Sequence, residues 1–244
     1  MTIPTTIPIT LHADPEHRGL RLAVILFLFV SMIVIYFLLN FIWSLSTGGF
    51  VPDYSFIVTC ISSILLGLVA IWGIEMGLKK VWHSGRAITL DEQGIRVQDR
   101  GAAPYLLDWQ GHMNNLFWYF VLEGYKRGGR ERRVPKNSLC LAIQVQEGEH
   151  RLIVYTYLSR KNAERLLVDN GRNSFVEIQP TELYQATVDS GYFAMPGRPD
   201  KIPADLLSGK EGPYWLAEQR RWTAGYELTP KDFEIFLQTV FSVQ

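Results

Sequence analysis

The chain has 244 residues, 48% of them hydrophobic, and its 24 basic and 24 acidic side chains leave no formal net charge. A neutral chain has no global field that attracts nucleic acid, so we expect no nucleic-acid partner. The charges are unevenly distributed, because only six of them lie in residues 1–78. The two parts of the chain are therefore expected to contact different solvents.

Two apolar runs near the N-terminus predict a transmembrane hairpin over residues 20–78, after an N-terminal segment of residues 1–19. Residues 22–43 contain no charge in 22 positions, which as an α-helix is about 33 Å and matches the hydrocarbon core of a bilayer. Residues 56–78 contain one charge, Glu75, within a turn of their end. The stretch STGGFVPD, residues 46–53, is typical of a tight turn between them.

Basic residues flank the outer ends of these runs and are absent from residues 44–53, which predicts that both termini face the cytoplasm. A cleaved signal peptide is the competing interpretation. It is disfavoured because the first run is longer than the usual apolar region of a signal peptide and a second span follows. Glu75 is either a functional intramembrane carboxylate or a helix-end group that reaches water or pairs with Lys79.

The second run carries small residues at helical spacing, which is the kind of surface that lets two helices approach closely. Its partner could be the first helix, a second copy of the chain or another subunit. The predicted packing residues are Ser63, Gly67, Ala70, Gly73 and Gly77.

After residue 79 the pattern changes to alternating apolar and polar residues, which predicts a mostly β cytoplasmic domain over residues 79–244. A helix is predicted over residues 162–169, and Thr229 and Pro230 begin a C-terminal helix with an apolar stripe. The fold class is thus a membrane helical hairpin followed by a half-open antiparallel barrel that this helix closes. The expected strands are 87–91, 95–99, 105–109, 116–122, 138–146 and 151–158, with a further short one at 175–178.

A family resemblance supports this architecture. GRAITLDEQGIRVQDRG, residues 85–101, and LLDWQGH, residues 106–112, resemble the opening hairpin and the tryptophan-bearing strand of bacterial pleckstrin-homology-like domains. The resemblance covers about residues 85–170. It implies the fold and a scaffolding role. It also implies a location in the bacterial plasma membrane, since one or two transmembrane helices often precede such domains. The family is largely of unknown function, so the resemblance implies little chemistry.

Residues 171–228 depart from a minimal domain of that kind, because they add a long segment with five prolines and many aromatic residues. Long irregular segments in compact domains are uncommon unless they bind something or are disordered, and the aromatic content argues against disorder. We expect this extension either to fold back onto its own sheet or to dock onto a partner.

The strongest charge cluster has six bases and one acid within eleven residues, on a loop between two predicted strands. Anionic lipid headgroups and an acidic protein face are both natural partners for it, and a merely solvated loop is the alternative. The predicted lipid-binding or partner-binding residues are Lys126, Arg127, Arg130, Arg132, Arg133 and Lys136.

The sequence shows no catalytic, cofactor-binding or metal-binding pattern. His12 to His17 is too flexible a segment for a metal cage, and Asp108 with His112 lacks a nucleophile. Cys60 and Cys140 are interpreted as packed thiols.

We therefore predict a non-enzymatic, membrane-anchored interaction module without cofactor or metal, such as an accessory or assembly subunit of a membrane complex. The alternatives are an anionic-lipid-binding scaffold, a membrane-surface enzyme with its site between the barrel and the extension, and a homo-oligomeric structural protein.

Overall fold

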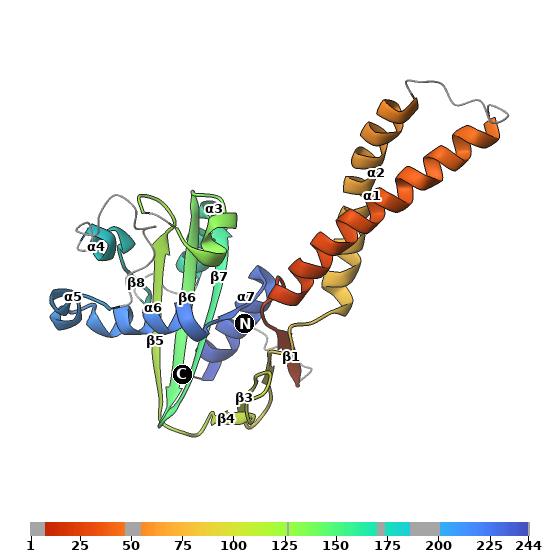
Figure 1. The fold of residues 1–244 in the computed structure, drawn as a ribbon. Helices are drawn as coiled ribbons and strands as arrows, with labels where there is room; N and C mark the ends of the chain where they lie inside the picture. Colours follow the sequence, from red (N-terminus) through yellow and green to blue (C-terminus); the bar gives the residue numbers. More distant parts are fainter. Residues whose placement is uncertain (1–7, 47–54, 126, 170–173, 186–200, 244) are drawn as a thin grey trace. The chain divides into compact units, whose positions relative to one another are not determined.

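The computed structural model describes residues 8–46, 55–125, 127–169, 174–185 and 201–243. The chain forms two compact units, a helical unit of residues 14–84 and a domain that joins residues before residue 14 to residues 85–244. Figure 1 shows the elements of each unit.

The helical unit contains α1 (Arg18–Ser46) and α2 (Ser55–Val81), of 29 and 27 residues. Both helices are long and apolar enough to cross a membrane. Most large apolar side chains on both helices are exposed, as lipid-facing side chains would be. The predicted turn at residues 46–53 lies, apart from Ser46, outside the described residues.

The two helices pack through one face of α2, on which every fourth residue is buried. Gly67 lies at the closest approach, because a Cβ there would come within 2.8 Å of Met32 Cγ. Gly67 therefore meets the first helix, as one of the three predicted alternatives had it, and Ser63 is buried on the same face. Gly73 and Gly77 are exposed with nothing within 4 Å, so they do not share this face. The buried face consists of Ser55, Thr59, Ser63, Gly67 and Ile71, and Ala70 is partly buried beside it.

Charged side chains gather where the two helices meet the domain linkers. Lys79 Nζ lies 2.8 Å from a Glu75 carboxylate oxygen and 3.0 Å from one of Glu16. The predicted pairing of Glu75 with Lys79 is therefore confirmed. His17 accepts a hydrogen bond from the Leu20 amide at 3.2 Å, which satisfies one open donor at the start of α1.

The first sheet of the domain contains a strand from each side of the helical hairpin. Its order is β1-β2-β3-β4, formed by β1 (Ile9–His12), β2 (Ala87–Leu90), β3 (Gly94–Gln98) and β4 (Tyr105–Asp108), all antiparallel. β1 pairs with β2 from Ile9 opposite Leu90 to His12 opposite Ala87. The prediction of a separate segment over residues 1–19 is thus wrong for β1, because four alternating residues are too short a pattern to recognise.

The predicted hairpin of residues 85–101 is present as β2 and β3. Gly94 is required there because a Cβ would meet Leu107 O of β4 at 2.0 Å. The predicted tryptophan, Trp109, follows β4 and donates its indole N–H to Asp91 O at 2.9 Å. The turn of the hairpin and the end of β4 are thereby fastened together.

The second sheet has the order β8-β5-β6-β7-β9. Its centre is an antiparallel meander that matches three predicted strands, and two-residue strands from the extension pair in parallel with its edges. The strands are β5 (Met113–Val121), β6 (Ser138–Glu147), β7 (His150–Ser159), β8 (Val176–Glu177) and β9 (Tyr226–Glu227).

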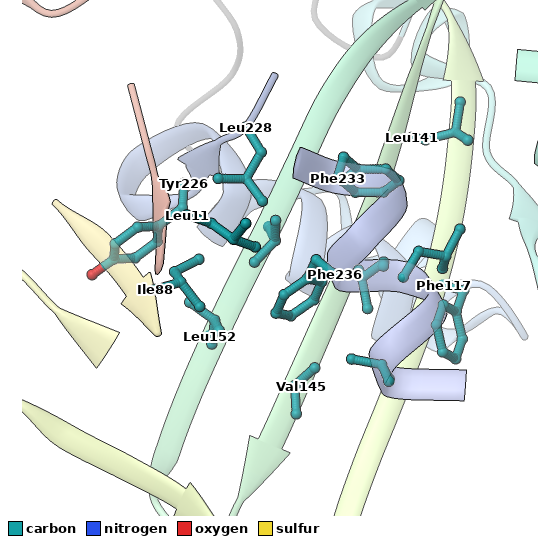
Figure 2. Close-up of a cluster of buried hydrophobic side chains, with 14 of the residues drawn as sticks. Leu11, Ile88, Phe117, Leu141, Val145, Leu152, Tyr226, Leu228, Phe233 and Phe236 are labelled. Atoms are coloured by element: carbon teal, nitrogen blue, oxygen red, sulfur yellow. The ribbon is translucent and has the colours of Figure 1, made fainter. Parts of the chain in front are cut away.

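The main core lies between the two sheets and the two predicted helices, α3 (Arg160–Asp169) and α7 (Pro230–Val243). Figure 2 shows Leu11 and Ile88 of the first sheet in one cluster with Val145 of the second sheet and with Phe233 and Phe236 of α7. Strand β1 therefore contributes to the domain core although it precedes the two long apolar helices in sequence.

The extension covers the other face of the second sheet with helical structure. It forms α4 (Pro180–Gln185), α5 (Ala204–Ser208) and α6 (Gly212–Ala224). Trp215 of α6 is fully buried against a second cluster that includes Trp118 and Phe120 of β5. Within the described residues the extension folds back onto its own sheet, one of the two predicted outcomes. Residues 174–185 and 201–228 of the expected irregular segment are instead largely helical, and Tyr192 and Phe193 lie outside the described residues.

Replacing Leu11 with Ala should destabilise the domain by about 2 to 4 kcal/mol, because it leaves a cavity in the core. The free energy of unfolding in mild detergent, measured by denaturant titration, checks this. The neighbouring exposed position gives a control, since Thr10→Ala removes only one exposed hydrogen bond, with Thr89 Oγ1 at 3.2 Å, and should cost less than about 1 kcal/mol. Equal effects of the two variants would contradict the placement of β1.

Gly67→Leu should lower the thermal unfolding midpoint of the detergent-solubilised protein, because the side chain would overlap Met32 and force the helices apart. Gly73→Leu introduces the same side chain where nothing lies within 4 Å, so it should leave the midpoint unchanged. A larger loss for Gly73→Leu would contradict the packing face described above.

Candidate functional site

The predicted basic cluster lies on the loop between β5 and β6, which contains a short 3-10 helix, η1 (Gly129–Arg133). Arg132, Arg133 and Lys136 are exposed. Lys126 lies outside the described residues. The structure thus keeps at least three of the six bases at the surface, where a lipid or protein partner could reach them.

Three bases of the cluster form hydrogen bonds that hold the loop in place. Exposed Arg132 donates from Nε to Arg127 O at 3.2 Å. Arg127 donates to the carbonyl oxygens of Glu131 and Val134. Arg130 Nη1 lies 3.1 Å from a Glu227 carboxylate oxygen and 3.2 Å from the Tyr155 hydroxyl, which ties η1 to β9 and β7. Charge alone groups all six bases together and does not reveal these structural roles.

Beneath the loop, Arg221 of α6 forms a buried ionic network with two carboxylates. Its Nη2 lies 2.7 Å from Glu131 Oε1 and 2.9 Å from Glu218 Oε1, and its Nε lies 2.7 Å from Glu218 Oε2. The three side chains are between 0% and 2% exposed. The guanidinium also lies over the Tyr155 ring, 4.7 Å from its centroid.

Two further donors complete the partners of these carboxylates. Trp118 Nε1 donates to Glu218 Oε2 at 3.0 Å, and the Tyr125 hydroxyl donates to Glu131 Oε2 at 3.2 Å. Every oxygen of the two carboxylates thus has a partner, which is the condition under which buried charge is tolerated. The network therefore fastens α6 and η1 to the sheet.

Sequence reasoning missed this network, although one signal for it was present. The run SLCLAIQV in β6 is buried throughout, and a strand that is apolar on both faces needs a cover on each side. That pattern indicates that the extension must return to the sheet. It does not indicate that Arg221 would meet Glu131, which is 90 residues away in sequence.

A pocket of about 170 Å³ opens beside this network, between β7, η1 and the C-terminal end of α6. Arg86 crosses it and donates to Ala224 O at 2.8 Å and to Gly225 O at 3.1 Å, where helix carbonyls need donors. The pocket is lined by Arg86, Gly129, Arg130, Tyr155, Tyr157, Arg221, Trp222, Thr223 and Gly225.

The lining of this pocket includes no carboxylate, imidazole or thiol. Burial raises the pKa of Tyr157 even though the guanidinium of Arg221 opposes this, so the phenol stays protonated at neutral pH. The three arginines that line the pocket contact acidic groups, namely Asp99, Glu227, Glu131 and Glu218. The pocket is therefore close to electrically neutral and is not specialised for an anion.

The other candidate groups have structural partners. Glu16 contacts Lys79 and Arg21, and His17 Nε2 lies 3.2 Å from Trp82 O. Among the described residues, no group of three or more His, Cys, Asp or Glu side chains is arranged to hold a metal ion. Cys140 is buried in the second cluster, and Cys60 is partly buried on α2.

Removing the guanidinium should destabilise the domain strongly. Arg221→Met leaves two buried carboxylates without their cation, and the expected loss is about 3 to 5 kcal/mol of unfolding free energy. Combining it with Glu131→Gln and Glu218→Gln should restore part of this stability. Arg220→Met at the adjacent, partly buried position is the control. It removes one hydrogen bond, to Gln144 Oε1 at 3.2 Å, and should cost about 1 to 2 kcal/mol. Equal losses from the two single variants would show that the ionic network does not stabilise the domain.

Comparisons of the chain with protein-family models, with curated proteins and with solved structures give no match.

Proposed function

We propose that this protein is a non-enzymatic interaction module of the bacterial plasma membrane, anchored by its helical hairpin, that serves as an accessory or assembly subunit of a membrane protein complex. Both termini then face the cytoplasm, and the domain acts at the inner surface. The observation that carries the proposal is the pairing of β1 with β2, which makes the hairpin an insertion within the domain.

This insertion gives the domain two connections to the membrane. Residues 13–17 join β1 to α1, and residues 82–86 join α2 to β2. Five residues span at most about 18 Å when fully extended, and both connections must be satisfied together. A domain held in this way works only on partners at the membrane surface, which suits a subunit better than a freely diffusing enzyme.

The polar groups of the domain favour an interaction role over catalysis. The buried carboxylates Glu131 and Glu218 are bound by Arg221 and do not line the pocket. The domain has a four-stranded and a five-stranded sheet whose shared core includes the C-terminal helix. The resemblance of residues 85–112 to bacterial pleckstrin-homology-like domains stays a prediction. Such domains imply a scaffolding role.

The exposed glycines of α2 leave a surface that another transmembrane helix could approach.

Purification of the tagged full chain from its native membranes in mild detergent tests the proposal. We expect stoichiometric co-purification with a larger membrane protein or complex. Gly73→Leu with Gly77→Leu should weaken this association if the exposed glycine face contributes to it. Val69→Leu, at another exposed position of α2, is the control.

A chain that elutes alone or only as a homo-oligomer, by native mass spectrometry, would contradict the subunit role and favour the homo-oligomeric alternative.

A further inference from the structure

The fold brings a second set of bases to the end of the sheet that carries the basic loop. β6 begins at Ser138 and β7 ends at Ser159, and these two residues are paired. Lys136 lies two residues before Ser138, and Lys161 lies two residues after Ser159 at the start of α3. Positions 25 residues apart in sequence therefore share one edge of the domain.

We call this edge the basic rim. Two acids lie near its five bases: Glu164 pairs with Arg160 at 3.0 Å, and Glu123 lies on the same loop as the η1 bases. Because these acids offset only two of the five positive charges, the rim keeps a positive net charge. All five of its bases are exposed: Arg132, Arg133, Lys136, Arg160 and Lys161.

The position of η1 within the domain relates the rim to the membrane linker. Arg86 lines the same pocket as Gly129 and Arg130, which belong to η1. Arg86 is also the fifth residue after Val81, where α2 ends. The start of η1 therefore lies next to the point at which the chain enters the domain from the second membrane helix, and Arg132 and Arg133 follow within the same short helix.

We propose that the basic rim binds the headgroups of anionic lipids in the bilayer that the hairpin spans. This inference rests on the proposed membrane anchoring and deepens it by naming the partner of the exposed bases. Lys79 and Lys80 at the end of α2 mark this side of the membrane as the basic, cytoplasmic side, where anionic lipids are concentrated.

An anionic bilayer fits the rim better than an acidic protein because it is always within reach of the tethered domain. The bases also come from two separate segments and form an extended edge, which suits a continuous charged surface. Near such a surface each lysine or arginine increases the preference for the bound state about fivefold.

Hydrogen exchange of the full chain in lipid nanodiscs tests this proposal. Discs of neutral phosphatidylcholine are compared with discs that also contain phosphatidylglycerol. We expect exchange of residues 130–137 and of the start of α3 to be severalfold slower in the anionic discs. The protection should disappear in 1 M salt, where the Debye length is about 3 Å.

Matched variants assign the effect to the rim. Arg132→Gln, Arg133→Gln and Lys136→Gln together should abolish the protection, and Lys161→Gln alone should reduce it. Arg96→Gln, Arg151→Gln and Lys210→Gln change the net charge equally at exposed positions outside the rim and should preserve the protection. All of these variants replace exposed side chains. Hydrogen exchange of the core strands in neutral discs at the same rate as in the unsubstituted protein would verify that the variants are folded.

Equal exchange in neutral and anionic discs would overturn the proposal. If the chain still co-purified with a membrane partner, the accessory role would stand, and loss of that partner in the triple variant would assign the rim to a protein. Protection in anionic discs without any co-purifying partner would instead support the rim and contradict the subunit role.

Discussion

The antiparallel pairing of β1 with β2 brings together the two chain segments that flank the apolar helices. Its hydrogen bonds and the burial of Leu11 make residues 9–12, which precede α1, part of the domain. Since the helices leave and re-enter the domain at neighbouring strands, the hairpin behaves as a long insertion in a β-hairpin. The first sheet cannot form completely without closing this loop, because β1 and β2 pair with each other.

The second sheet depends on a different constraint, the need to cover two apolar faces. The first sheet, α3 and α7 cover one face, and α6 covers the other. The buried contact of Arg221 with Glu131 and Glu218 then fixes the direction of α6 and the conformation of η1 together. A hydrophobic residue in place of Arg221 could cover the sheet equally well, but it would not specify which loop meets the helix.

These two constraints meet at Arg86. Its guanidinium binds the last carbonyls of α6, and its position follows directly from the end of α2. The residue that leads from α2 into β2 therefore contacts α6, the helix whose Arg221 holds the basic loop. Within the domain, the strand that follows α2, the buried ionic network and the exposed basic loop are thus linked by direct contacts.

The sequence by itself determined the two apolar helices, the strands β2 to β7, α3 and α7, because hydrophobic periodicity and capping residues are local signals. It also located the loop that carries the exposed bases. Only the tertiary structure placed β1 in the first sheet, returned the extension to the second sheet and divided the basic cluster into structural and exposed members. It also separated Gly73 and Gly77 from the packing face of Ser63 and Gly67. These features depend on contacts between residues far apart in the chain or on the rotation of one helix against another, and local patterns carry no information about which distant partner a buried charge or an edge strand will meet.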